Sequence, residues 1–245
     1  TALVEIDGDG YTYEMIGEKV SELSSILRSK GIVEGDRVAL LSENKPNWGL
    51  AYFSIATMGA VVVPILPDFH ENEVHHILRH AECKAIFVSQ KMYDKIEEFD
   101  GEHLETVILL EDFQILPPEM KKDMLSDVLR KGSQEFSKLK SAALKFAGKV
   151  SAEVQEEDLA TIIYTSGTTG HSKGVMLTHK NLVFDTVKSY IVQPLKPTDR
   201  MLSVLPLSHT FECTLGLILP IYGGASVHYL SKPPTPRLLM EALSK

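Results

Sequence analysis

The spacing of apolar residues along the chain predicts strands that alternate with helices. Short runs of β-branched and aliphatic residues predict strands at residues 38–42, 61–65, 84–89 and 106–110. Between these runs, apolar residues at helical spacing predict helices near residues 46–58, 71–80 and 91–98. This alternation is typical of an α/β fold, in which helices cover a mostly parallel sheet.

The pattern has an N-terminal extension and a second cycle. Residues 3–13 alternate around Asp7-Gly8-Asp9-Gly10, which predicts a hairpin, and a helix follows from Met15 to a stop at Gly31. After Ser151, strands are predicted at residues 159–165, 175–178, 201–205 and 225–230, with a helix at 181–192. The second cycle therefore repeats the α/β pattern of the first.

A basic insert separates the two cycles. Residues 119–149 contain eight Lys or Arg and four acidic residues, with apolar positions at helical intervals on both sides of Gly132. We interpret this insert as two amphipathic helices. The predicted organisation is a first α/β subdomain at residues 1–150, which includes the insert, and the start of a second subdomain at residues 151–245.

Composition narrows the class of protein. The chain has 245 residues, of which 44% are hydrophobic, and this length allows roughly 70–75% of the unfolded surface to be buried. The formal net charge of −8 disfavours a nucleic-acid partner, because such proteins present basic surfaces. The only cysteines, Cys83 and Cys213, supply neither a disulfide framework nor a four-cysteine zinc site, so we expect a cytoplasmic protein.

Two segments bear on targeting and termini. The most apolar stretch, residues 214–230, is interrupted by proline, glycine and histidine and falls short of the about 20 residues that a membrane helix needs, so we expect buried core. The chain begins with Thr1 rather than methionine and stops at Lys245 inside an amphipathic pattern. We therefore expect the natural termini to lie elsewhere.

The segment most informative about chemistry is Tyr164-Thr-Ser-Gly-Thr-Thr-Gly-His-Ser-Lys-Gly174, between two predicted strands. Glycines at 167 and 170 allow the backbone to turn and to approach a ligand closely. The hydroxyl groups of Thr165, Ser166, Thr168 and Thr169 and the charge of Lys173 suit phosphate oxygens. The P-loop and G-x-G-x-x-G patterns do not match any segment of the chain.

This segment resembles the phosphate-binding motif of the adenylate-forming (AMP-binding) superfamily, and the match continues through Val175-Met-Leu-Thr-His179. Ser172 stands where many members have proline. Further segments resemble the family in order and spacing: Gly35-Asp36-Arg37-Val38, Asn44, Pro46, Trp48, Gly59-Ala-Val-Val-Val-Pro64 and Pro206-Leu-Ser-His-Thr-Phe-Glu212. The last of these, with the insert, is most similar to long-chain fatty acyl-CoA synthetases.

The resemblance implies the N-terminal region of an adenylate-forming domain and an ATP-dependent, AMP-forming ligase. In such enzymes a carboxylate, here a fatty acid, reacts with ATP to give acyl-AMP, and coenzyme A then displaces AMP; Mg²⁺ is the accompanying ion. The ATP phosphates would bind Thr165, Ser166, Gly167, Thr168, Thr169, Gly170, Lys173 and Gly174. His209 would position the acyl carboxylate, and Glu212 is a second candidate.

The family's later motifs for adenine, ribose and the catalytic lysine do not occur in these 245 residues. We therefore expect the N-terminal part of a ligase, inactive on its own. The acyl chain length, the final thiol acceptor and the oligomeric state stay open.

A serine hydrolase is the main alternative. Gly170-x-Ser172-x-Gly174 matches the nucleophile elbow of such enzymes. Asp185 or Asp199, followed by His209 or His228, would complete a triad in the required chain order. The elbow needs a helix directly after the serine, whereas the sequence predicts a strand.

Two weaker alternatives concern binding. His76, His80 and Cys83 share one predicted helical face and could contribute to a zinc site, although no fourth ligand is evident. The basic insert could contact anionic membranes peripherally, as part of a non-catalytic binding module or as an accessory to the ligase.

Overall fold

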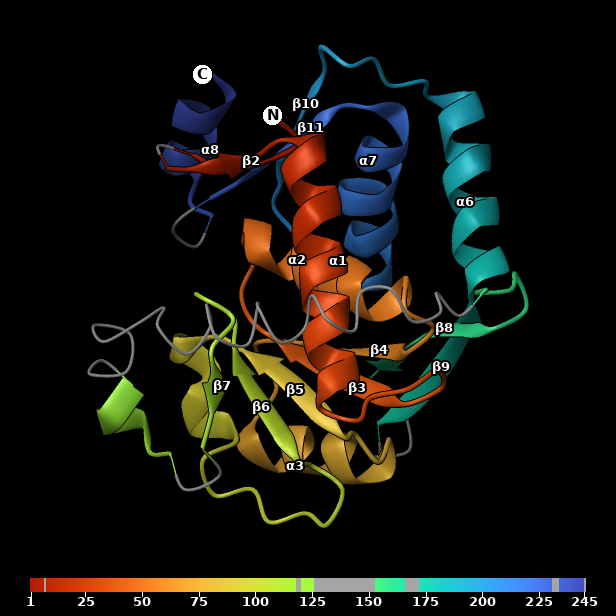
Figure 1. Cartoon of the computed structure of the whole chain (residues 1–245). Helices are drawn as coiled ribbons and strands as arrows, with labels where there is room; N and C mark the ends of the chain where they lie inside the picture. The colour runs from red at the N-terminus through yellow and green to blue at the C-terminus, as the bar shows by residue number, and fades with distance from the viewer. Residues whose placement is uncertain (7, 118–119, 126–152, 166–171, 231–233, 245) are drawn as a thin grey trace.

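The computed structural model describes residues 1–6, 8–117, 120–125, 153–165, 172–230 and 234–244 (Figure 1). Its strands are β1 (Leu3–Glu5), β2 (Gly10–Tyr11), β3 (Arg37–Leu41), β4 (Val61–Ile65), β5 (Ala85–Val88), β6 (Thr106–Leu109), β7 (Ile115–Leu116), β8 (Leu159–Thr165), β9 (Lys173–Thr178), β10 (Arg200–Ser203) and β11 (Ser226–Tyr229). Its helices are α1 (Tyr13–Ser29), α2 (Pro46–Ala56), α3 (Glu71–His80), the 3₁₀ helix η1 (Gln90–Lys95), α6 (His179–Val192), the π-helix η2 (Glu212–Ile218), α7 (Leu219–Gly223) and α8 (Pro236–Leu243).

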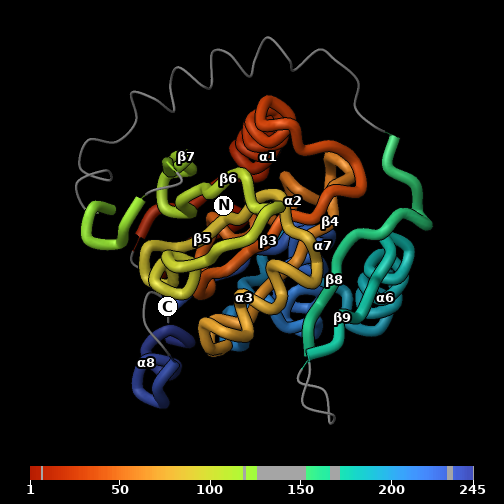
Figure 2. The backbone as a smooth tube through the Cα atoms, turned by 90° about the horizontal axis from the view of Figure 1, so that it is seen from below, coloured from red at the N-terminus to blue at the C-terminus, as the bar shows by residue number. Residues whose placement is uncertain are grey.

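The larger sheet has seven strands in the order β7-β6-β5-β3-β4-β8-β9. Strands β6, β5, β3, β4 and β8 run parallel, and the edge strands β7 and β9 are antiparallel to their neighbours. Side chains along a strand point alternately to the two faces. Val38 and Leu40 accordingly join a core with α1 and α2, whereas Ala39 and Leu41 join a core with α3 and η1. Figure 2 shows α1 and α3 on opposite sides of β3 and β5, as predicted for a covered sheet.

The smaller sheet has the order β10-β11-β1-β2 and joins the two ends of the chain. The N-terminal hairpin forms as predicted, with Leu3 opposite Tyr11. Strand β1 also pairs in parallel with β11, where Leu3 lies opposite Val227. Leu3 and Val227 belong to the same core as α1 and α2, so the two sheets pack around a shared interior.

The sheets combine segments from both predicted cycles. Strands β8 and β9 extend the sheet of the first cycle, and β1 and β2 extend the sheet that contains β10 and β11. The predicted boundary at residue 150 is therefore not a boundary between sheets. Most of the insert at residues 119–149, with its two predicted helices, lies outside the described residues.

The structure corrects one local prediction and confirms another. The helix predicted at residues 91–98 is the short 3₁₀ helix η1, and Phe99 then packs against the core of α3. The apolar stretch at residues 214–230 is buried as expected, with Leu217, Ala225 and Val227 fully buried. Among the described helices, none is long and apolar enough to cross a membrane.

Candidate functional site

The predicted phosphate loop connects β8 to β9 at one edge of the seven-stranded sheet. The strands pair antiparallel, with Tyr164 opposite Gly174 and Thr165 opposite Lys173. Thr165 and Lys173 are both exposed at the last described pair of this hairpin. The other predicted phosphate contacts lie outside the described residues: Ser166, Gly167, Thr168, Thr169 and Gly170.

Tyr164 anchors the base of this hairpin. Its side chain is 3% exposed, and its hydroxyl oxygen lies 2.6 Å from Nδ1 of His80, the last residue of α3. A Cβ atom on Gly174 would lie 2.8 Å from Cγ2 of Ile162 and 3.3 Å from Cζ of Tyr164, so this position requires glycine. The base is therefore fixed by packing, while Thr165 and Lys173 beyond it face solvent.

Strand β9 leads directly into α6 through a reciprocal cap. Oγ1 of Thr178 accepts a hydrogen bond from the backbone N–H of Asn181 at 3.3 Å. The side-chain Oδ1 of Asn181 in turn accepts one from the backbone N–H of Thr178 at 3.0 Å. This capping box satisfies two amide groups that would otherwise be unpaired. The Thr-His-x-Asn sequence thus ends the strand and begins the helix without an intervening loop.

The hairpin leaves the sheet at the edge where ligands of open α/β folds bind. Strand β8 is parallel to β4, and β4 is parallel to β3, so their carboxyl ends share one edge. Only β4 separates β3 from β8, which corresponds to about 10 Å at the usual strand spacing. The loop after β3, which contains Asn44, therefore lies at the same edge as the β8–β9 hairpin, called the phosphate hairpin below.

Asn44 binds the turn that carries His209. Its Nδ2 donates to the Leu205 carbonyl at 2.6 Å, and its Oδ1 accepts from the Leu207 amide at 2.8 Å. The turn continues with a hydrogen bond from the His209 amide to the Pro206 carbonyl at 2.9 Å. The side chain of His209 is exposed. The structure thus brings the His209 turn to the same edge of the sheet as the phosphate hairpin.

Glu212 is turned inward. It is 6% exposed, and its Oε1 accepts hydrogen bonds from Oγ of Ser203 at 2.7 Å and from the Val204 amide at 3.2 Å. Burial raises the pKa of this carboxyl above its usual range, although the hydrogen bonds from Ser203, Val204 and the Leu205 amide, together with the nearby His209, oppose the rise. A Cβ on Gly216 would lie 2.6 Å from Cδ of Glu212, so glycine makes room for the carboxyl within η2. These contacts give Glu212 a role in holding the turn.

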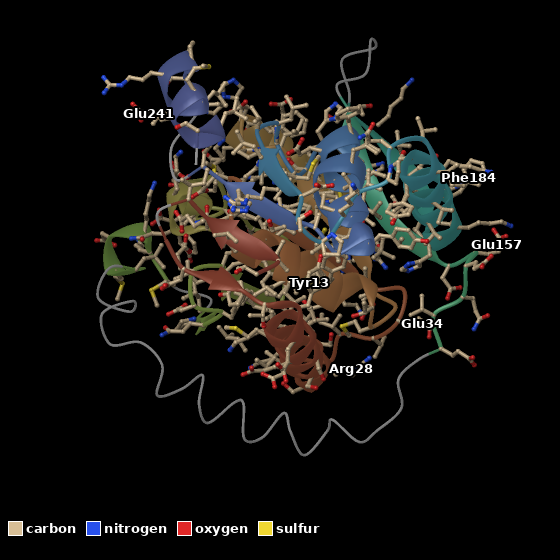
Figure 3. All side chains as sticks on the ribbon, turned by 90° about the horizontal axis from the view of Figure 1, so that it is seen from above. Tyr13, Arg28, Glu34, Glu157, Phe184 and Glu241 are labelled. Atoms are coloured by element: carbon tan, nitrogen blue, oxygen red, sulfur yellow. The ribbon has the colours of Figure 1, made fainter. Side chains whose placement is uncertain are left out.

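An apolar groove of about 740 Å³ runs between α6, β10 and η2, next to Glu212. Its volume falls within the roughly 300–1,000 Å³ of small-molecule sites. The apolar side chains that line it are Val192, Leu195, Met201, Leu202, Phe211, Leu215 and Leu219. Phe184 lies on the outer side of α6 (Figure 3).

Comparison with known proteins identifies the family. The model of the family described as "AMP-binding enzyme" matches residues 1–245. The chain belongs to this family. The family match supports the resemblance drawn from the phosphate loop and the His209 segment, and the two sheets are those of an adenylate-forming N-terminal region.

Individual family members extend well beyond the length of this chain. The long chain acyl-CoA synthetase 7, peroxisomal, of Arabidopsis thaliana is 30% identical over 224 residues, which cover 89% of this chain and 31% of the relative. The crotonobetaine/carnitine–CoA ligase of Salmonella paratyphi C is 28% identical over 223 residues, which cover 90% of this chain and 40% of that protein. The ATP-bound crystal structure of MatB from Rhodopseudomonas palustris superposes with a TM-score of 0.79 at 20% identity, covering 100% of this chain and 44% of MatB. The chain therefore spans less than half of these family members.

The geometry of the AMP-binding chain does not fit the hydrolase alternative. Strand β9 begins at Lys173, directly after Ser172, where a nucleophile elbow requires a helix. The candidate histidines have other contacts: Nδ1 of His209 accepts from the Phe211 amide at 3.3 Å, and Nε2 of His228 lies 3.0 Å from Oγ of Ser226. The prediction of a strand after Ser172 is confirmed.

The zinc alternative also lacks support. Nδ1 of His80 is engaged by Tyr164, and Cys83 is 1% exposed, with its pKa raised to about 12 by burial. Burial thus favours the neutral thiol over the thiolate form that zinc binds. Within the described ranges, no group of three His, Cys, Asp or Glu side chains is placed to hold a metal ion.

Local sequence did not reveal the roles of Asn44, Ser203 and His80. Asn44 was noted only as a residue shared with the family, and its partners lie far along the chain. The available signal was its position directly after a buried strand, because polar residues at that edge of an α/β sheet meet residues from other loops.

The anchor between Tyr164 and His80 can be tested by pH. Burial, with the nearby Cys83, raises the pKa of Tyr164 to about 12 from 10.0. Tyr164→Phe should lower the free energy of unfolding by about 0.5–1.5 kcal/mol at neutral pH, because one hydrogen bond is lost. The folded state disfavours the phenolate, so the contribution of Tyr164 is present below pH 10 and is lost as pH rises toward 12. Denaturant unfolding should show the two proteins converging over this range, and a constant difference would contradict the raised pKa.

Proposed function

We propose that this chain is the N-terminal part of an ATP-dependent, AMP-forming CoA ligase that activates long-chain fatty acids in the cytoplasm. The observation that supports the proposal is that the β8–β9 hairpin and the His209 turn both lie at the carboxyl edge of the seven-stranded sheet. The family match and the name of the Arabidopsis relative support the reaction type and the fatty-acid substrate. The ATP-bound MatB structure, which shares the fold, supports ATP as the nucleotide.

The proposed reaction has two steps. A carboxylate oxygen of the fatty acid attacks the α-phosphorus of ATP, and the bond to the β-phosphate breaks to release pyrophosphate. The sulfur of coenzyme A then attacks the acyl carbonyl carbon, and AMP leaves. The protein needs no nucleophile of its own for this chemistry, so its contribution is positioning and electrostatic stabilisation.

The residues of the chain divide this work. Lys173 and the donors at positions 165–170 and 174 would bind the ATP phosphates and offset charge that moves onto the departing pyrophosphate. His209, exposed at the same edge of the sheet, would orient the acyl carboxylate. The apolar groove between α6 and η2 would take the hydrocarbon chain, whose burial supplies about 0.8 kcal/mol per CH₂ group.

The described residues do not by themselves fit a magnesium site. Mg²⁺ usually takes one or two carboxylates together with substrate phosphates. Glu212, which is bonded to residues at the start of the His209 turn, is buried, and its Oε1 is occupied by hydrogen bonds from Ser203 and Val204.

The proposal is tested by ATP–pyrophosphate exchange. A chain extended to the length of its relatives should exchange pyrophosphate into ATP in the presence of long-chain fatty acids. Residues 1–245 alone should stay at background, because the later nucleotide motifs are not among them. A preference for crotonobetaine or another short acid would replace the fatty-acid assignment and keep the reaction type.

Esterase activity would contradict the ligase proposal. If the extended protein shows no exchange but hydrolyses esters, and a fluorophosphonate probe labels Ser172, the ligase proposal is wrong. The structure leads us to expect no such labelling, because Ser172 precedes a strand.

A further inference from the structure

The His209 turn has few supports of its own. Residues 204–209 are not part of a regular strand or helix, and His209 is exposed. The backbone contacts of His209 are its amide to the Pro206 carbonyl and its own carbonyl to the Cys213 amide, both at 2.9 Å. The imidazole itself accepts a hydrogen bond at Nδ1 from the Phe211 backbone amide at 3.3 Å, whereas the position of the turn depends on groups outside it.

Asn44 supplies the first of these groups, and both the nitrogen and the oxygen of its side-chain amide are hydrogen-bonded. Besides the bonds to Leu205 and Leu207, its Nδ2 donates to Oγ of Ser203 at 3.0 Å. All three bonds go to residues that lead into the turn. Because Asn44 lies in the loop just after β3, which ends at Leu41, the turn is tied to the central strand of the seven-stranded sheet.

Ser203 passes this connection on to Glu212. Its Oγ accepts a hydrogen bond from Asn44 and donates one to Oε1 of Glu212 at 2.7 Å. Oε1 of Glu212 also accepts a hydrogen bond from the Val204 backbone amide. Ser203 is 3% exposed and Glu212 6%, so water competes little for these bonds. The chain of hydrogen bonds therefore holds the turn at both ends, between β10 and η2.

We propose that Asn44 and Glu212, linked through Ser203, are positioning residues that hold the His209 turn against the carboxyl edge of the seven-stranded sheet. The inference rests on the proposed function for its effect on catalysis. The hydrogen-bonded set of Asn44, Ser203 and Glu212, called the clamp below, is itself a property of the fold. Glu212 acts mainly as a hydrogen-bond acceptor, from Ser203 and from the backbone amides of Val204 and Leu205. A displacement of about 1 Å in a positioning group can cost on the order of 100-fold in rate.

Asn47 provides a matched control for Asn44. Its Nδ2 donates to the carbonyls of Leu110 and Glu111 at 2.8 and 3.0 Å, and its Oδ1 accepts from the Tyr11 hydroxyl at 2.7 Å. Asn44 and Asn47 are both half-buried and each makes three side-chain hydrogen bonds, but those of Asn47 do not reach the His209 turn. Asn44→Asp and Asn47→Asp each replace two donors with an acceptor.

The first readout is activity in the extended ligase. Asn44→Asp should lower kcat/KM for the carboxylate by about 10- to 100-fold, with the KM for ATP changed less than about twofold. Asn47→Asp should lower the melting temperature to a similar degree and leave kcat/KM within about twofold. Equal losses of kcat/KM in the two variants would overturn the proposal.

The second readout does not require activity. Amide exchange at residues 204–209 should become at least about tenfold faster in Asn44→Asp and in Ser203→Ala, and should not change in Asn47→Asp. Unchanged exchange in Asn44→Asp would overturn the clamp even if the ligase is active. Faster exchange in a protein without adenylation would support the clamp and refute the proposed function.

Glu212 is tested by its conservative variant. Glu212→Gln keeps an acceptor oxygen for Ser203 and Val204, so it should retain activity within about threefold, whereas Glu212→Leu should lose at least about tenfold. If Glu212→Gln loses as much as Glu212→Leu, Glu212 acts through its charge and the assignment as a positioning residue is wrong.

Discussion

Lys173→Ala should lower kcat/KM for acyl-adenylate formation by about 100-fold or more in the extended ligase. Lys173 is exposed at the last described pair of the β8–β9 hairpin, opposite Thr165, where it can reach an incoming phosphate. Removing one group that stabilises transition-state charge typically costs this much. ATP–pyrophosphate exchange at saturating and limiting ATP would separate the loss in kcat from the loss in ATP binding.

Lys180→Ala is the matched control for this prediction. Lys180 is also exposed and is the second residue of α6, but it pairs with Glu157 at the other end of β9. Its loss should change kcat/KM by less than about twofold, because exposed ion pairs contribute little. Comparable losses in the two lysine variants would indicate a general charge effect and would contradict a specific phosphate contact by Lys173.

Phe87→Ala should destabilise the fold by about 3–5 kcal/mol. Phe87 lies in β5, next to the central strand β3, is fully buried, and meets Phe113 edge-on with ring centroids 6.2 Å apart. The change would leave a cavity between the sheet and the helices α1 and α2 and would remove the aromatic pair. Urea unfolding followed by the fluorescence of Trp48, the single tryptophan, measures the loss.

Phe184→Ala gives the reference for a phenylalanine outside the core. Its side chain on α6 is 58% exposed, so we expect a change of less than about 0.5 kcal/mol. A loss below about 1 kcal/mol for Phe87→Ala would show that the core repacks around the cavity, in conflict with the close packing described for β5.

The candidate site was only partly accessible from the sequence. The phosphate hairpin is local: the apolar run of β8, the glycines of the loop and the cap at Thr178 lie within about 20 consecutive residues, and short-range rules apply to them. The clamp on the His209 turn is not local, because Asn44 and Leu207 are 163 positions apart. Neither segment alone shows that the other is its partner.

The same distinction applies to the fold. Periodicity alone determined the α/β class, the N-terminal hairpin and most helices, because side-chain alternation and helical spacing reflect burial of one or both faces of an element. Only the tertiary structure decided that β1 pairs with β11, that β8 and β9 extend the first sheet, and that Glu212 turns inward to Ser203. Such pairings depend on which surfaces remain to be covered once the elements pack, and this competition involves residues from the whole chain.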